Sequence, residues 1–79
     1  MTRFQTNLAE LIVAARTTQS DLARDTGISR ATINYWCQAR IGTRQYLSDY
    51  SGSTLAALRI YFERELGYEP QIIYEVSDY

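Results

Sequence analysis

The sequence predicts an all-α fold, a compact bundle of four to five short helices. Apolar residues recur at intervals of three and four over several stretches, which is the spacing of one helix face. Serine or threonine stands before several of these stretches, where a helix N-cap is expected, and glycine follows two of them, at Gly27 and Gly67, where a helix ends. The 79 residues suffice for a single domain, 1–79.

The first predicted helix spans residues 3–16. Its apolar face is predicted to consist of Phe4, Leu8, Leu11, Ile12 and Ala15. Two capping patterns, "TRFQ" at 2–5 and "NLAE" at 7–10, compete for its start, so the sequence leaves its first residue open.

Two shorter helices are predicted next, over residues 19–25 and 29–38. Thr18 is the expected N-cap of the first, with Asp21 placed favourably against the positive end of the helix dipole. Gly27 is expected to enter the left-handed conformation between the two helices, and Ser29 to cap the second.

Residues 39–52 show no periodicity and form an unusually long connection for so small a domain. Thr43 is expected to cap a turn there that docks Tyr46, Leu47 and Tyr50 on the core.

The last predicted helix, "TLAALRIYFEREL", is expected to be capped by Ser53 and to end at Gly67. The tail that follows has two interpretations. Pro70 favours a short helix, whereas the β-branched and aromatic residues after it favour an edge strand. The apolar stripe of the last helix is predicted to comprise Leu55, Leu58, Phe62 and Leu66.

The formal charge of −1 conceals an asymmetry along the chain. All eight basic residues are arginine. Residues 1–44 carry six arginines against three carboxylates, or +3, and residues 45–79 carry two against six, or −4. Because the guanidinium group binds phosphates and guanine edges through two parallel hydrogen bonds, the first half is the one suited to nucleic acid.

Several function classes are excluded. No apolar run approaches the roughly 20 residues of a membrane span, and the N-terminus lacks the apolar core of a secretory signal, so a cytoplasmic protein is expected. The lone Cys37 and the absence of histidine exclude an internal disulfide and a Cys/His zinc site. With no glycine-rich phosphate loop either, we expect no enzyme, cofactor or small-molecule ligand.

Residues 18–38 carry the most specific pattern. Two helices joined by a tight glycine turn cross steeply only if small and apolar side chains fill the space between them. The side chains expected there belong to Leu22, Ala23, Ile28, Ile33 and Trp36, and Gly27 is expected to make the turn.

The pattern Q-x-x-L-A-x-x-x-G-I-S-x-x-x-I-x-x-W, residues 19–36, resembles the Cro/repressor-type (Xre) helix-turn-helix family at eight of its eighteen positions. The chain departs from that family in the longer segment 39–52 and in its acidic, tyrosine-rich second half. The resemblance implies a repressor-like DNA-binding domain whose helix-turn-helix core spans about 18–38.

The resemblance also implies roles for single residues, with the helix 29–38 lying in the DNA major groove. The expected base contacts are Arg30, Thr32, Asn34 and Tyr35. The expected phosphate contacts are Gln19, Ser29, Gln38, Arg40 and Arg44.

We therefore expect a small transcriptional regulator, a repressor, that binds double-stranded DNA as a homodimer. Six of the seven tyrosines follow residue 45, and tyrosine is enriched at protein interfaces. The tail 68–79 is the expected dimerisation segment, through Tyr68, Ile72, Ile73, Tyr74 and Tyr79. The alternative is a protein-interaction module on the same scaffold, antirepressor- or antitoxin-like, that binds a protein partner with its acidic half.

Overall fold

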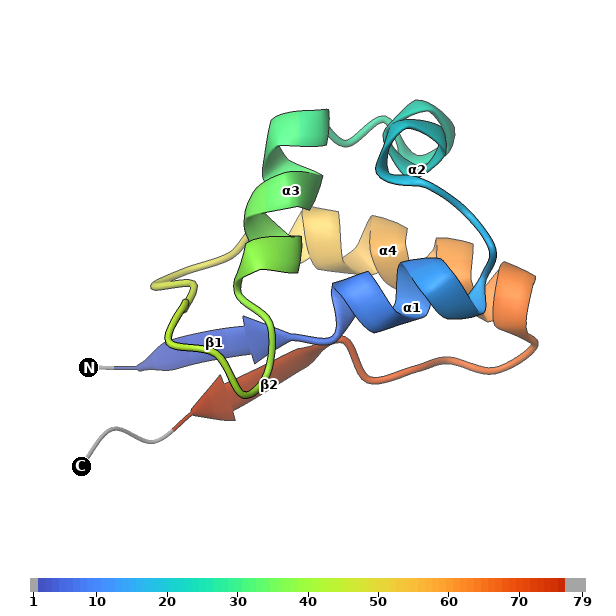
Figure 1. Ribbon diagram of the computed structural model, residues 1–79. Helices are drawn as coiled ribbons and strands as arrows, with labels where there is room; N and C mark the ends of the chain where they lie inside the picture. Colours follow the sequence, from blue (N-terminus) through green and yellow to red (C-terminus); the bar gives the residue numbers. More distant parts are fainter. Residues whose placement is uncertain (1, 77–79) are drawn as a thin grey trace.

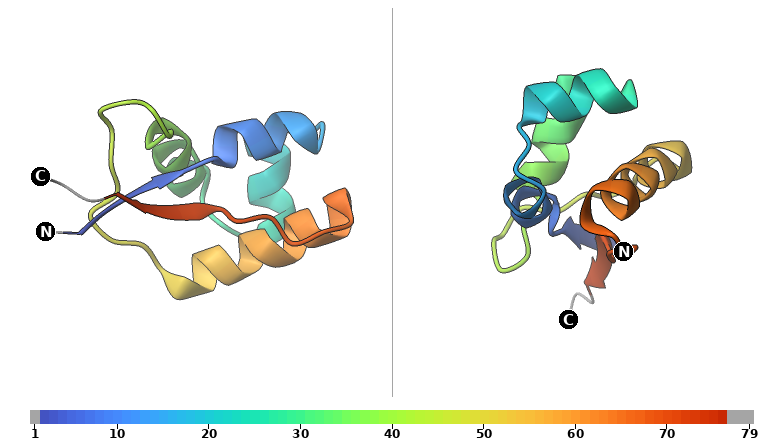
Figure 2. Two further views of the ribbon diagram at one scale, coloured as in Figure 1. Left: turned by 90° about the horizontal axis from the view of Figure 1, so that it is seen from below. Right: turned by 90° about the vertical axis from the view of Figure 1, so that its right-hand side faces the viewer.

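A computed structural model of the chain describes residues 2–76. Within that range, four helices and two strands occur in the order β1 Arg3–Thr6, α1 Leu8–Ala14, α2 Gln19–Thr26, α3 Arg30–Gln38, α4 Gly52–Leu66 and β2 Ile73–Val76 (Figure 1). Helices α2 and α3 lie on one side of the molecule and α4 on the other (Figure 2, right). The four helices agree with the predicted fold, but the two strands show that it is not strictly all-α.

The first difference is at residues 3–6, which form strand β1 instead of the first turn of a helix. The spacing of Phe4 to Leu8 fits a helix locally, but the backbone of β1 is satisfied by distant partners on both of its edges. One edge pairs antiparallel with β2, and on the other Phe4 N–H donates to Leu47 O and Leu47 N–H to Phe4 O, both at 2.8 Å. Helix α1 consequently begins only at Leu8.

The second difference is in the tail, where the extended interpretation is correct and the helix beginning at Pro70 is wrong. Strand β2 pairs Tyr74 with Gln5 and Ile73 with Thr6. Ile72, just before the strand, is fully buried. The pairing partner lies almost the whole chain length away, so no local pattern decides between the two interpretations.

The helix boundaries around the turn are confirmed. Thr18 Oγ1 accepts a hydrogen bond from Asp21 N–H at 3.1 Å, and Ser29 Oγ accepts one from Thr32 N–H at 3.1 Å. Gly27 ends α2 in the left-handed region at φ 77°. Helix α2 runs one residue further than predicted, to Thr26.

Helix α4 starts earlier than predicted, because Ser51 and not Ser53 is its N-cap. Ser51 has the extended backbone of a capping residue, and its hydroxyl accepts from Thr54 N–H. Ser53 lies inside the first turn, and its hydroxyl is 2.8 Å from that of Ser51. Gly67 ends the helix at φ 81°, as predicted.

One apolar core joins all these elements. Tyr50 brings the segment after α3 onto the core, with its ring edge-to-face against Phe4 at 4.8 Å and Trp36 at 6.1 Å between ring centroids. No helix within residues 2–76 has the length and apolar character that crossing a membrane requires. The buried apolar residues are Leu8, Leu11, Ile12, Leu22, Ile33, Trp36, Ala39, Leu47, Leu55, Leu58, Tyr61, Phe62 and Ile72.

Candidate nucleic-acid interface

Helices α2 and α3 form the predicted helix-turn-helix. Leu22 of α2 and both Ile33 and Trp36 of α3 are buried, while Ala23 and Ile28 are half-buried against the same cluster. Because Ile33 and Trp36 occupy one side of α3, its opposite side faces away from the core. The packing thus leaves a whole helix face available to a partner.

That face of α3 carries polar and aromatic side chains. Arg30, Asn34, Tyr35 and Gln38 are exposed, Tyr35 to 51%. Within residues 2–76, none of these four side chains takes part in a hydrogen bond, ion pair or ring contact. Their donors and acceptors are therefore free to bind a ligand without breaking an internal interaction.

Thr32 is placed differently from the other three predicted base contacts. It is half-buried, and its hydroxyl accepts a hydrogen bond from Ser29 Oγ at 2.8 Å. Both residues line an open polar cavity of about 360 Å³ between the turn and the first turn of α4, where Ser53 and Thr54 face them. The structure therefore groups Thr32 with Ser29 at the helix cap.

Gln19 is the first residue of α2 and is half-buried, and within residues 2–76 its side chain has no hydrogen-bond partner. Gln19 and Gln38 thus place one amide side chain at the start of α2 and one at the end of α3.

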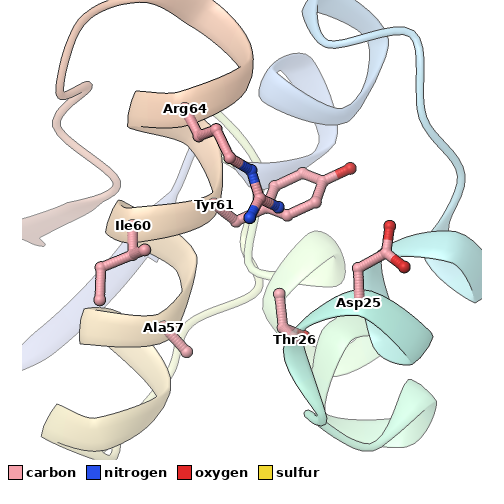
Figure 3. A pocket seen from close by; sticks show the side chains of 6 residues that line it. All are labelled: Asp25, Thr26, Ala57, Ile60, Tyr61 and Arg64. Atoms are coloured by element: carbon pink, nitrogen blue, oxygen red, sulfur yellow. The ribbon is translucent and has the colours of Figure 1, made fainter.

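Helix α2 also forms a cleft with α4, of about 210 Å³, which contains none of the predicted contact residues (Figure 3). Asp25 and Thr26 line it from α2, and Tyr61 and Arg64 from α4. The Arg64 guanidinium lies over the Tyr61 ring, 5.5 Å from its centroid. The cleft therefore lies where the helix-turn-helix meets α4.

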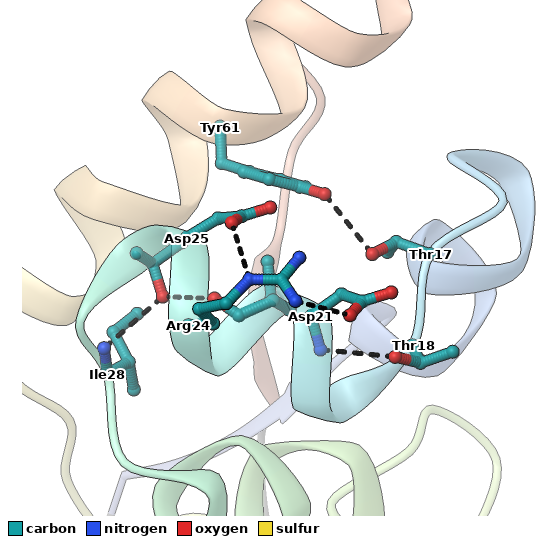
Figure 4. Close-up of polar contacts among 9 residues, drawn as sticks. Thr17, Thr18, Asp21, Arg24, Asp25, Ile28 and Tyr61 are labelled. Carbon is teal, nitrogen blue, oxygen red and sulfur yellow. Dashed lines mark hydrogen bonds and ion pairs between the residues drawn. The ribbon is translucent and has the colours of Figure 1, made fainter.

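The arginines of the first half do not form one continuous basic face. Arg24 is held between Asp21 and Asp25, each at 3.3 Å (Figure 4), and Arg40 pairs with Glu10. Arg3 lies over the Tyr46 ring, 5.1 Å from its centroid.

Arg30 and Arg44, by contrast, are exposed and form no ion pair within residues 2–76. Arg16, between α1 and α2, is likewise exposed and forms no ion pair in that range. The positive charge that is free for a ligand therefore lies at three places: between α1 and α2, at the start of α3 and in the segment that follows α3.

Two residues that support this interface, Gln5 and Thr6, lie in strand β1, where the apolar spacing predicts a helix. Thr6 is fully buried, and its hydroxyl donates to Trp36 O at 2.7 Å, while its N–H donates to Ala39 O at 2.7 Å. Gln5 is 6% exposed and bonds to the segment after α3. The bonds by which they hold α3 and the segment after it are not marked by a local pattern, because those partners lie 30 or more positions away.

Cys37 lies on α3 beside the core and is half-buried. Burial, and next the negative charge of Glu10, raise the pKa of its thiol to about 11. The thiol is therefore neutral at physiological pH. Among residues 2–76, no cluster of side chains fit to hold a metal ion is present.

Only part of the predicted dimerisation segment is exposed and can contact a partner. Ile72 is wrong as an interface residue, because its side chain is fully buried in the core. Tyr68 is 59% exposed, whereas Ile73 and Tyr74 are half-buried, and Tyr74 Oη donates to Gln71 O at 3.3 Å. Tyr79 lies outside the described residues. In the described part of the chain, β2 pairs with β1 alone, so its second edge has no strand partner.

Comparison with known proteins agrees with this geometry. A family model described as the Cro/C1-type HTH DNA-binding domain matches residues 7–63, from just before α1 to near the end of α4. Both strands lie outside the matched residues. No curated protein and no solved structure matches the chain.

Proposed function

Because this chain belongs to the family of Cro/C1-type helix-turn-helix DNA-binding domains, we propose that it is a small transcriptional regulator that binds a specific double-stranded DNA sequence with α3 in the major groove. The observation that carries the proposal is the exposed face of α3. It presents one arginine, two amides and one tyrosine, all without partners in the described chain.

The chemistry of this face fits base edges. The Arg30 guanidinium matches guanine O6 and N7, and the Asn34 amide matches adenine N6 and N7. Tyr35 supplies an aromatic surface with a hydroxyl at its tip. Thr32, turned toward the helix cap with Ser29, is better placed for a phosphate than for a base.

Phosphate contacts would fix the position of α3 in the groove. Gln19 at the start of α2 and Gln38 at the end of α3 carry free amides in the described chain. Arg44 carries a free charge beyond α3, whereas Arg40 has to share its charge with Glu10.

The net negative charge of the chain does not oppose this mode of binding. Two of the carboxylates, Glu63 and Glu65, belong to α4, and this helix lies on the other side of the molecule from α2 and α3 (Figure 2). The molecule measures 37 × 24 × 20 Å, so charges on its far side lie beyond the Debye length of about 8 Å at physiological salt. The carboxylates of α2 are neutralised in part by Arg24.

A domain of this size gains affinity and specificity by binding as a dimer to two half-sites about one helical turn, roughly 34 Å, apart. The free edge of β2 and the exposed Tyr68 are the surfaces that suit such a dimer. Repression would follow from occupation of a promoter, without chemistry.

The test is selection of bound duplexes from a random-sequence DNA library, followed by fluorescence anisotropy on the enriched duplex. Arg30→Ala should weaken binding by about 1–3 kcal/mol and abolish the preference at one base pair. The control is Arg59→Ala, which removes the same charge from α4, where Arg59 lies 3.8 Å from Glu69, and should leave the preference unchanged.

Absence of any enriched sequence, with folded protein at low salt, would contradict the proposal. A search for a protein partner of the acidic, tyrosine-rich half would then follow.

A further inference from the structure

Strand β1 is bordered on one edge by β2 and on the other by the segment that follows α3. Thr6 N–H donates to Ala39 O at 2.7 Å, and Ile41 N–H to Thr6 O at 3.2 Å. Further along, Phe4 and Leu47 exchange two hydrogen bonds. Between these two attachment points the chain leaves β1 and forms an arch, residues 41–46.

The side chain of Gln5 fills the space between the two attachment points. Its Nε2 lies 3.2 Å from Arg40 O, 3.0 Å from Thr43 O and 3.2 Å from Gln45 O. A primary amide has two N–H groups, so three carbonyls share two donors. Since Gln5 is almost fully buried, water cannot readily replace these bonds.

The arch is shaped around this amide. Thr43 Oγ1 donates to Arg40 O at 2.7 Å and accepts from Gln45 N–H at 3.2 Å. Gly42 takes φ 90°, which an L-residue rarely adopts. The carbonyls on either side of Arg44 thus both bond to Gln5, while the Arg44 side chain is exposed.

The arch is also fixed relative to the recognition helix. Thr6, next to Gln5, donates its hydroxyl to Trp36 O in the last turns of α3. In the side view the arch lies at the end of α3, on the same side of the molecule as α2 and α3 (Figure 2, right). A single four-residue strand therefore connects α3 and the arch.

From this arrangement we propose that Gln5 is a positioning residue for DNA binding, which holds the arch so that Arg44 contacts a backbone phosphate flanking the site of α3. Gln5 itself touches no DNA and acts through Arg44. The proposal rests on the proposed function, and it adds to it a residue that lies outside the region matched by the family model.

The test is a double-mutant cycle between Gln5 and Arg44, measured on a fluorescein-labelled duplex of random sequence at several salt concentrations. Phosphate contacts do not depend on sequence, so this probe reports them directly. Gln5→Glu keeps the shape of the side chain but presents acceptor oxygens to three carbonyl oxygens, so the arch should open.

In the wild-type background, Arg44→Ala should lower the slope of log affinity against log salt by about 1, the loss of one phosphate contact. Gln5→Glu should cause the same loss, and adding Arg44→Ala to it should cause no further change. Additive losses would overturn the proposal, because Arg44 would then bind DNA independently of Gln5. If the folded wild type does not bind at low salt, the proposed function is overturned together with this proposal. That result differs from additive losses, which would overturn only the role of Gln5.

Two further variants separate positioning from general stability. Gln5→Met has a similar volume and no hydrogen-bond donors. It replaces Gln5→Glu in the cycle if the charged variant fails to fold, and it should give the same result. Leu66→Ala shortens a half-buried side chain at the end of α4, far along the chain from the arch, and should leave the effect of Arg44→Ala intact. Loss of that effect in Leu66→Ala would also overturn the proposal.

Discussion

At the scale of single residues, helix α3 receives a contact from a threonine hydroxyl in another element. Thr6 Oγ1 donates to Trp36 O, one of the last carbonyls of α3, which have no partner within the helix. Thr6→Val keeps the shape but removes both the donor to Trp36 O and the acceptor of Leu8 N–H. Because each buried group left unpaired costs about 1–3 kcal/mol, the free energy of unfolding should fall by at least about 1–3 kcal/mol. Urea unfolding followed by Trp36 fluorescence measures this loss. Thr6→Ser retains the hydroxyl and should lose less; equal losses would show that the methyl group matters instead.

Cys37 gives a pH dependence whose sign can be stated. Burial raises the pKa of its thiol from 9.0 to about 11, so between these values the folded protein keeps a proton that the unfolded chain has released. The contribution of the thiol to the free energy of unfolding should therefore be fully present below pH 9. The free energy of unfolding should fall as the pH rises from 9 toward 11. Cys37→Ala removes this contribution and leaves every other side chain in place. The difference between the two unfolding curves isolates the thiol, and a difference that does not change with pH would contradict the assignment.

At the scale of elements, the turn between α2 and α3 depends on one backbone conformation. Gly27 has φ 77°, and a Cβ added there meets nothing within 4 Å, so Gly27→Ala is opposed by the backbone alone. We expect a loss of about 1–2 kcal/mol in the free energy of unfolding, and a smaller loss for Gly27→Asn, because asparagine tolerates this region better.

Gly52 provides the matched control. It also has open space around its Cβ position, but it lies in the first turn of α4 without a positive φ. Gly52→Ala should therefore raise the free energy of unfolding, by up to about 1 kcal/mol. Equal effects of the two substitutions in chemical denaturation would mean that φ at Gly27 is not the cause.

The same scale shows what the sequence can and cannot predict. The α2–α3 unit is encoded locally: Thr18, Gly27 and Ser29 lie within a few residues of the backbone groups that they cap or turn. Strands β1 and β2 are not, since each four-residue segment gains its conformation from a partner at the other end of the chain. For the site, three of the four expected base contacts, Arg30, Asn34 and Tyr35, are exposed, whereas Thr32 is half-buried and bonded to Ser29. The buried contacts of Gln5 and Thr6 depend on the strands, so the sequence does not predict them.

At the scale of the whole molecule, the two ends of the chain complete the helical unit. Strand β1 is bonded to the end of α3, to the arch and to β2, so α3 and the free edge of β2 are connected through one strand. Neither strand lies within the residues matched by the family model. A partner that binds along β2 would therefore be joined to α3 by a short and rigid path.

The proposed dimer can be tested at that edge. Because the backbone groups of Phe4 point to Leu47, those of its partner Glu75 point to the free edge of β2. Glu75→Pro removes one outward N–H and leaves the bonds to β1 in place, since proline is tolerated on the open side of an edge strand. Light scattering should show a dimer for the wild type and for Glu75→Ala, which keeps the N–H, and a monomer for Glu75→Pro, with weaker binding to a duplex that carries both half-sites. If Glu75→Pro dimerises as the wild type does, the dimer uses another surface, and Tyr68 becomes the residue to substitute next, because it is the most exposed aromatic side chain in the described part of the tail.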